Sequence, residues 1–383
     1  MKTNFSMFSE LTTEEFLINY WQKKPLLIRQ ALSQFSGLLD KLQLFALAGL
    51  EDVQSRLVTE RHGKWQVQNG PFKATKFARL GKSKWTVLVQ GVNQQLPAAA
   101  ALLKNFSFIP HARLDDLMVS YAPKGGGVGA HFDSYDVFLL QGSGHRRWQI
   151  SAQRDQTLEE DAPLRILKHF QMEQEWVLAP GDMLYLPPHF AHNGIAESDC
   201  MTYSIGFRAP TYQELSEQFL VYLQDRICLD GIYADADLKV QRHPSEIGAD
   251  MLLQVTQVIR RIHWTKRDIA NFLGNYLSDP KPHIFFDPPT KLLTPARFEQ
   301  VIQTRGVAMA LKTQMLCHNG MVFVNGVAHE VGKYAYQELR SLADARQIDP
   351  TSNLSREAFE LLYLWYTDGY IVPIVSKLKH IAK

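Results

Sequence analysis

The pair His131 and Asp133, in the stretch GGGVGAHFDSYDVFLLQG, has the residue types and spacing of a metal site. Residues two apart in an extended strand face the same side, so a strand through HFDSYDVFLL would direct both side chains to one face, together with Tyr135, Val137 and Leu139. Both faces of this segment are largely apolar, and a buried carboxylate needs a partner. A metal ion is one partner. A hydrogen-bonded pair at a strand end is the alternative, because His-x-Asp occurs by chance about once in a chain of this length.

A later histidine could complete the ligand set. The segment LAPGDMLYLPPHFAHNG contains a Gly-Asp turn, a strand, a Pro-Pro bend and then His192. This order can bring an imidazole back against the first strand. His189 is the competitor, but the pattern favours His192 and makes His189 a loop residue near the entrance. Two histidines and one carboxylate leave three positions open on an iron, which is the arrangement of non-haem Fe(II) oxygenases.

Two further strands carry candidate ligand contacts. In HRRWQIS, Arg146 shares a face with Trp148 and Ile150, and an arginine turned inward needs an anion. A buried salt bridge would also satisfy it. In CMTYSIG, Thr202 and Ser204 form a small polar stripe, which suits a cavity with a polar ligand but also fits ordinary small barrel residues.

The elements that must position these residues are mostly short strands. From about residue 85 to 207 they alternate with Gly and Pro, which predicts a sandwich or barrel. Before them, TTEEFLINYW predicts a capped helix and PLLIR a strand. The glycine run 125–127 lacks the Lys-Ser/Thr ending of a phosphate loop, so we expect a tight or mobile approach to the metal strand instead.

At Pro210 the sequence pattern changes from short strands to helices. Thr211 followed by Glu214 is a capping-box pattern, and helices are expected from there, at 245–263 and at 265–277. After the proline-rich linker 278–290 we expect a helix from Thr294-Pro295, a strand VAMALKTQMLCH paired with MVFVN through Asn319-Gly320, helices at 332–346 and 355–367, and a strand YIVPI. These boundaries predict three domains, at residues 1–209, 210–285 and 286–383.

Composition limits the class of protein. The chain has 383 residues, a net charge of +2 and 45% apolar residues, which favours a folded multidomain protein over a strongly basic nucleic-acid binder. Three widely separated cysteines fit a reducing compartment. The start of the sequence has no signal-peptide pattern and no apolar run approaches a membrane span, so a cytoplasmic protein is expected.

The segments HFD, DVFLLQGSGHRRW, LAPGDMLYLPPHFAH and TYSIGFRAP resemble the JmjC-type cupin oxygenases. They are most similar to the bacterial ribosomal oxygenases, which hydroxylate an arginine of protein sixteen of the large ribosomal subunit. NYWQKKPLLIRQAL near the start shares the resemblance, and the region after Pro210 shares the order of elements. The resemblance implies a mixed α+β chain with a double-stranded β-helix (the cupin or JmjC barrel), an α-helical dimerisation region that makes a homodimer, and a winged-helix-like C-terminal domain.

The resemblance also implies the cofactors and their ligands. Fe(II) would be held by His131, Asp133 and His192, with 2-oxoglutarate and O2 as co-substrates. Arg146 would bind the distal carboxylate of 2-oxoglutarate, with Thr202 and Ser204 nearby.

Two more residues would position the target arginine. The resemblance assigns this role to Asp116, in DDLMVSY, and to Tyr135. A carboxylate is the natural partner of a planar guanidinium. A register shift of one residue would exchange Asp116 for its neighbour Asp115.

The main hypothesis is therefore an Fe(II)- and 2-oxoglutarate-dependent hydroxylase of a ribosomal protein. A histidine hydroxylase or demethylase of the same superfamily would keep the cofactors and change the substrate. A ligand-sensing cupin joined to a winged helix could instead regulate transcription, but the helices at 332–346 and 355–367 are mixed or acidic, and no direct DNA binding is expected.

Overall fold

The computed structural model describes residues 11–374, so the first ten and last nine residues of the outer predicted domains lie outside the described residues. The N-terminal half is rich in short strands between residues 85 and 207, as predicted, and it adds helices and a hairpin before them that the sequence analysis did not predict. Its helices and strands are α1 Thr13–Asn19, β1 Leu26–Ile28, α2 Lys41–Leu47, β2 Ser55–Arg61, β3 Lys64–Asn69, α3 Ala74–Ala78, β4 Trp85–Val89, α4 Pro97–Leu103, β5 Leu114–Ala122, β6 Asp136–Gln141, β7 Arg146–Ser151, β8 Gln174–Leu178, β9 Met183–Leu186, β10 Ala191–Ala196 and β11 Cys200–Phe207.

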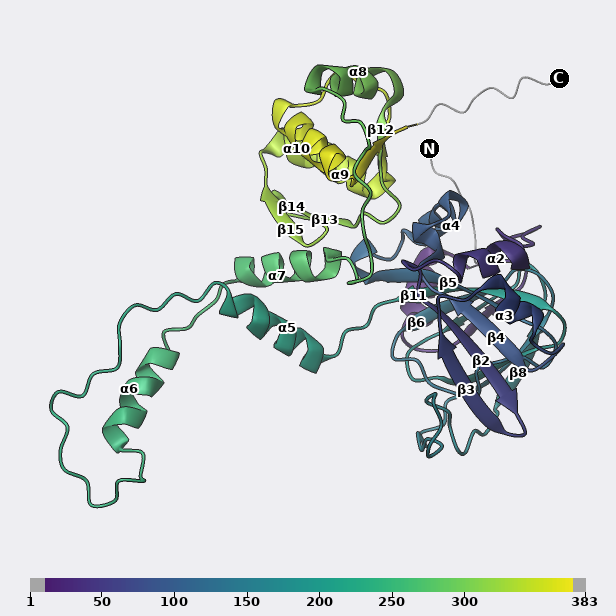
Figure 1. The fold of residues 1–383 in the computed structure, drawn as a ribbon, viewed down its shortest axis with the longest axis horizontal. Helices are drawn as coiled ribbons and strands as arrows, with labels where there is room; N and C mark the ends of the chain where they lie inside the picture. Colours follow the sequence, from purple (N-terminus) through teal and green to yellow (C-terminus); the bar gives the residue numbers. More distant parts are fainter. Residues whose placement is uncertain (1–10, 375–383) are drawn as a thin grey trace.

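These strands form two antiparallel sheets. The larger has eight strands in the order β1-β9-β6-β11-β5-β4-β2-β3, and the smaller has the order β10-β7-β8. Together they make the double-stranded β-helix of the mixed α+β fold, with the strands crowded in one half of the molecule (Figure 1). The antiparallel pairing brings His192 of β10 directly opposite Ile150 of β7.

The two faces of the larger sheet bury different cores. On β6, Val137 and Leu139 pack with Trp148 of β7 between the sheets, as the period-two pattern predicts. Phe138 lies on the other face, in the core that the N-terminal helices cover. At its centre Phe16 of α1 is fully buried, with its ring centroid 5.0 Å from that of Tyr185.

The extended segment predicted from His131 through residue 140 is wrong at its start. Residues 132–135 form no strand, and β6 begins at Asp136. His131 instead makes an isolated antiparallel bridge with His192, in which each backbone N–H donates to the other residue's carbonyl. The two histidines therefore converge through backbone pairing, and strand alternation does not account for the direction of Asp133.

A helical region follows: α5 Tyr212–Gln224, α6 Ala249–Ile259, which is shorter than predicted, and α7 Lys266–Ser278. The predicted capping box at Thr211 forms only half. Thr211 accepts the Glu214 N–H, but the Glu214 carboxylate accepts from the Tyr276 hydroxyl instead. In Figure 1, α6 and its flanking loops extend away from the rest of the chain.

The C-terminal unit is a winged helix with its own core. Its elements are α8 Pro295–Arg305, β12 Val307–Met309, β13 Met315–His318, β14 Met321–Val324, β15 Val327–Glu330, α9 Lys333–Ala345, β16 Gln347–Ile348, α10 Arg356–Thr367 and β17 Ile371–Pro373. The single predicted strand VAMALKTQMLCH is wrong, because a turn closed by the Thr313 N–H and the Ala310 carbonyl separates β12 from β13.

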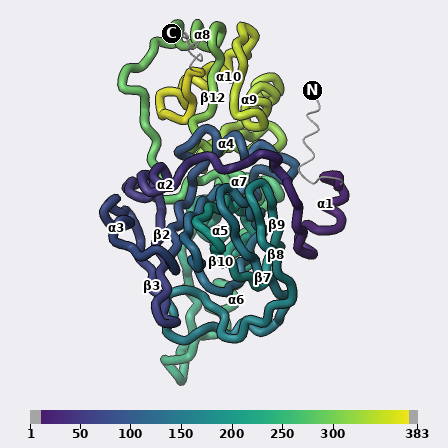
Figure 2. Tube along the Cα trace, turned by 90° about the vertical axis from the view of Figure 1, so that its right-hand side faces the viewer, coloured from purple at the N-terminus to yellow at the C-terminus, as the bar shows by residue number. Residues whose placement is uncertain are grey.

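The C-terminal unit lies over α4 and α7 (Figures 1 and 2). The ammonium of Lys104, after α4, donates to the carbonyl of Ala345 at 3.2 Å. Gly274 of α7 faces Phe323 of β14 so closely that a Cβ there would come within 2.4 Å of the ring. Helix α7 also contacts α5, so it joins the helical region to the winged helix. Among the described residues, no helix is long and apolar enough to cross a membrane.

Candidate metal centre and substrate cavity

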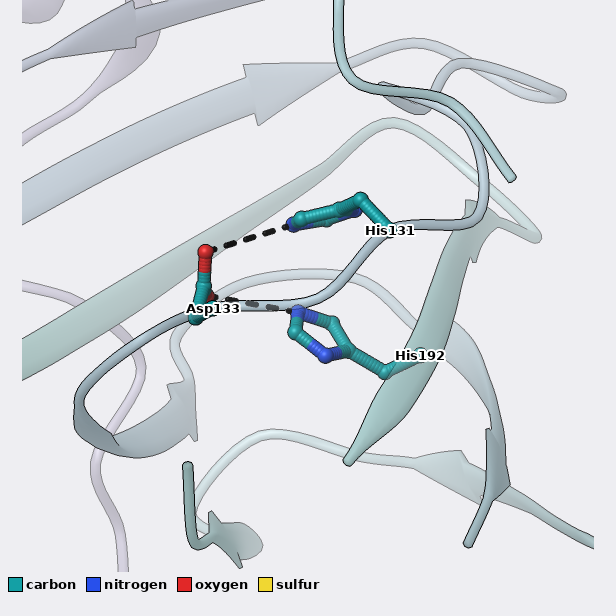
Figure 3. Close-up of side chains that lie close together, drawn as sticks. All are labelled: His131, Asp133 and His192. Atoms are coloured by element: carbon teal, nitrogen blue, oxygen red, sulfur yellow. Dashed lines mark ion pairs between the residues drawn. The ribbon is translucent and has the colours of Figure 1, made fainter. Parts of the chain in front are cut away.

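Three side chains converge as the sequence predicts for a metal site. One ligand atom from each of His131, Asp133 and His192 lies within 4.8 Å of the others. Asp133 lies between the imidazoles, with Oδ1 3.9 Å from Nε2 of His131 and Oδ2 3.5 Å from Nε2 of His192 (Figure 3). The set of two imidazoles and one carboxylate on one side fits Fe(II) with open coordination positions.

The backbone fixes which nitrogen of each histidine faces the site. Nδ1 of His131 lies 2.9 Å from the Gly129 carbonyl, and Nδ1 of His192 lies 3.0 Å from the Phe190 carbonyl. A carbonyl only accepts, so Nδ1 carries the proton and Nε2 presents its lone pair to the metal. Burial, and after it the neighbouring His131, lowers the pKa of His192 to about 4, which keeps the ring neutral at pH 7.

His189 is exposed and outside the ligand group, as expected for a loop residue. It has a different task that the sequence analysis missed. Its backbone N–H donates to the Asp133 carbonyl at 2.9 Å, with His189 itself in the left-handed conformation at φ 65°. The loop after β9 thereby fixes the main chain that carries the metal-site carboxylate.

The triad opens into a cavity of about 360 Å³ between the two sheets. The glycine-rich approach lies against its wall. A Cβ on Gly127 would come within 2.6 Å of the Gly194 carbonyl, and one on Gly194 within 2.7 Å of the Trp148 ring. Only glycine allows these backbones to pack so closely, which agrees with the tight approach expected from the sequence.

Arg146 extends into the cavity from β7 and has no carboxylate partner among the described residues. It is 5% exposed, Nε has no hydrogen-bond partner, and Nη1 lies 3.3 Å from the hydroxyls of Ser120 and Thr202. Burial lowers the pKa of this guanidinium. A desolvated cation with spare donors needs an anion, and the carboxylate of 2-oxoglutarate supplies one.

Other polar groups along this wall suit the same ligand. The indole Nε1 of Trp148 is buried and has no hydrogen-bond partner in the described range 11–374. Ser204 lines the cavity, and Thr202 both receives from Arg146 and donates to Gln141 at 3.1 Å. The residues present therefore fit a small dianion next to the metal. Sequence reasoning missed Ser120, which lies on β5 directly opposite Thr202 of β11.

The larger sheet also carries the two aspartates, near the start of β5. Leu117 pairs with Ile205 and Leu114 pairs with Phe207, so Asp115 and Asp116 together face the single residue Gly206. This is a β-bulge, which redirects side chains that would otherwise alternate. Both aspartates consequently line the cavity. Their burial and their partners therefore distinguish which of them is available to a substrate.

Asp116 is the more buried of the two, at 7% exposed. Its Oδ2 accepts the Gly91 N–H at 2.8 Å, and Oδ1 has no hydrogen-bond donor within the described part of the chain. A Cβ on Gly206 would lie 4.0 Å from Oδ1 and 3.7 Å from the Tyr135 ring, so these two side chains flank the open space above this glycine. Burial, and after it the charge of Asp115, raises the pKa of Asp116 to about 6.

Family comparisons agree with this geometry. A JmjC domain family matches residues 101–215, and a ROXA-like winged helix family matches residues 261–371. The chain is 35% identical over 280 residues to the ribosomal protein uL16 3-hydroxylase of Escherichia coli, an alignment that covers 73% of this chain and 74% of that protein. It is 44% identical over 216 residues to a probable ribosomal oxygenase of Haemophilus influenzae, covering 55% of this chain and 53% of that one.

Solved structures agree over almost the whole chain. The ribosomal oxygenase YcfD of E. coli, in complex with cobalt and 2-oxoglutarate, matches with a TM-score of 0.80 at 30% identity, covering 94% of this chain and 98% of that chain. A complex of the same protein with cobalt and succinic acid matches with a TM-score of 0.77. Together with the ligand triad and the unpaired Arg146, these matches establish the class of enzyme. The chain belongs to the JmjC-type ribosomal oxygenases, 2-oxoglutarate-dependent enzymes that use Fe(II).

Proposed function

We propose that this enzyme hydroxylates an arginine side chain of ribosomal protein uL16. The observation that carries the proposal is the pair Asp116 and Tyr135, which lines the same cavity as the metal triad. The free Oδ1 of Asp116 offers a guanidinium a charged acceptor in a desolvated place, where such a pair is strong and selective. The E. coli relative named as a uL16 3-hydroxylase supports the choice of protein.

The residues that line the cavity have distinct tasks in this proposal. His131, Asp133 and His192 hold the metal, and Arg146 with Thr202 and Ser204 holds 2-oxoglutarate. When bound, Fe(II) and 2-oxoglutarate supply the oxidation, in which O2 and the 2-oxo acid give succinate, CO2 and one oxygen atom for a C–H bond. Asp116 fixes the guanidinium end of the arginine, so that the aliphatic part of the side chain reaches the metal.

Tyr135 completes the arginine site. The side chain is 39% exposed, and its partial burial, followed by the charges of Asp133 and Asp116, raises the pKa of the phenol, so the ring stays neutral. A neutral aromatic face can stack on a guanidinium without competing for Asp116. A histidine side chain lacks the planar fork that matches a carboxylate, which favours arginine over histidine as the target.

We also propose that α6 lies in a homodimer interface. No residue of α6 is buried, and its apolar side chains Met251, Leu252, Leu253, Val255, Val258 and Ile259 are all exposed. A helix with this much exposed apolar surface needs a partner. A second copy is the partner we propose, because the helical region 210–285 resembles a dimerisation element. Sedimentation equilibrium of the full chain against Leu252→Glu tests this: a dimer that dissociates in the variant supports it, and a monomeric wild type refutes it.

The substrate proposal is tested by mass spectrometry of isolated ribosomal proteins incubated with the enzyme, Fe(II) and 2-oxoglutarate, with Asp133→Ala as the control. We expect one added oxygen on an arginine of uL16, absent with the variant. Oxidation of a histidine, or of another protein, would refute the assignment of the substrate while leaving the oxygenase chemistry intact. We also propose a cytoplasmic enzyme, in keeping with a ribosomal substrate, and fractionation of cells can check this.

A further inference from the structure

The two aspartates of the bulge differ in their partners. Asp115 is bound by two cations, with the Lys281 ammonium 3.0 Å and the Arg208 guanidinium 3.5 Å from its Oδ1. Among residues 11–374, Asp116 accepts a hydrogen bond only from the Gly91 backbone N–H, at Oδ2. Asp115 is about 30% exposed, so it could otherwise receive a substrate cation itself.

Lys281 comes from a distant part of the chain, the linker that follows α7. Lys312 of the winged helix holds this linker against the barrel, because its ammonium lies 3.0 Å from Asp52 Oδ2 and donates to the Phe285 carbonyl at 2.9 Å. Asp115 separates the substrate cavity from a small hollow lined by Lys281 and Lys312. The C-terminal half therefore reaches the wall of the substrate cavity through one lysine.

We propose that Lys281 is a positioning residue for the target arginine, because it holds Asp115 and so leaves Asp116 as the single carboxylate that receives the guanidinium. This inference rests on the proposed arginine site. On this inference the linker and the winged helix help to position the substrate, because their position determines whether Lys281 reaches Asp115. This role does not involve nucleic acid.

The charge balance around Asp116 makes the role measurable. The charged groups that act on its carboxylate are Asp115, Lys281 and Arg208. Tyr135 and Arg56 line the same cavity. Loss of Lys281 removes positive charge next to Asp115, so the negative field of Asp115 acts more strongly on Asp116. The ionised form of Asp116 is then less favourable, and the acid limb of the pH profile moves to higher pH.

The experiment uses full-length Lys281→Ala, Lys281→Arg and the double variant Asp115→Asn/Lys281→Ala. Lys291→Ala is the matched control, because Lys291 is an exposed linker lysine without an ion pair among the described residues. We expect Lys281→Ala to raise KM for uL16 about tenfold, to leave KM for 2-oxoglutarate unchanged, and to shift the acid limb of kcat/KM upward. Arginine at position 281 should restore both, and the double variant should return the acid limb toward lower pH, since Asp115 then carries no charge.

Several results would overturn the inference. If Lys281→Ala matches Lys291→Ala in KM and pH profile, Lys281 does not position the substrate. If the double variant is as impaired as the single variant, the lysine acts structurally and not through Asp115. Failure of the proposed function is separate, because it would appear as a wild-type enzyme that does not oxidise arginine in uL16.

Discussion

Replacement of Asp116 by Asn should remove activity and stabilise the protein at neutral pH. The pKa of this carboxyl is raised to about 6 by burial first and by Asp115 next, so ionisation of the folded protein is costly. Asparagine keeps the size of the side chain and an oxygen that can accept the Gly91 N–H. The substitution therefore removes the buried charge and little else.

The magnitude follows from the shift. The pKa of this aspartate is near 3.8 in the unfolded chain and about 6 in the folded protein. Its ionisation therefore lowers the free energy of unfolding by about 3 kcal/mol. The sign depends on pH. Below about pH 4 the carboxyl is protonated in both states, and wild type and variant should be equally stable. As pH rises from about 4 to about 6, the wild type loses this stability, and above that range the variant keeps its full advantage.

Thermal unfolding at several pH values measures this difference. At roughly 2–4 °C per kcal/mol for a domain of this size, the variant should melt up to about 10 °C higher at pH 7.5, with the difference vanishing near pH 4. Asp237→Asn, at an exposed position, is the control and should show no such trend. A variant that is less stable at pH 7.5, or a difference that does not change with pH, would refute the argument. Activity on uL16 should fall by at least about 100-fold, because the guanidinium loses its charged partner.

Three further substitutions test other parts of the structure. Arg146→Met should raise KM for 2-oxoglutarate about 100-fold, because a charge-assisted contact worth about 3 kcal/mol is lost. The melting temperature of the ligand-free protein should not fall. A large loss of stability would mean that Arg146 is structural. Gly206→Val should raise KM for uL16 but not for 2-oxoglutarate, since the added methyl groups fill the space between Tyr135 and Asp116; equal effects on both would refute this. Phe16→Ala should destabilise the barrel by about 3–5 kcal/mol in denaturant unfolding, because its ring is fully buried. A loss below about 1 kcal/mol would show that this core rearranges to fill the space.

The inward direction of Arg146 and Trp148 was predictable because its signal is local. Arg146 and Trp148 alternate with outward residues in one strand, so period two alone predicts their direction. The hairpin at Asn319-Gly320 was predictable for a similar reason, and both residues have the positive φ angles that this turn requires. The metal pair was identified for a partly wrong reason. Residues 132–135 are not extended, and backbone pairing between His131 and His192 brings the site together.

Substrate selection depends on features that a local pattern cannot reveal. Strand alternation predicts that one of Asp115 and Asp116 faces inward, yet the bulge opposite Gly206 directs both to the cavity. Their different roles then come from their partners. Gly91 lies in the loop after β4, and Lys281 lies beyond three helices, so neither contact has a sequence signature. In the sequence, the segment that carries Lys281 appears only as a proline-rich connection. The fold brings Lys281 of this linker to Asp115 at the cavity wall, and Lys312 pairs with Asp52 of the barrel nearby. The class of chemistry can therefore be inferred from short motifs, whereas the proposed arginine site depends on contacts between the C-terminal half and the barrel that no short motif reveals.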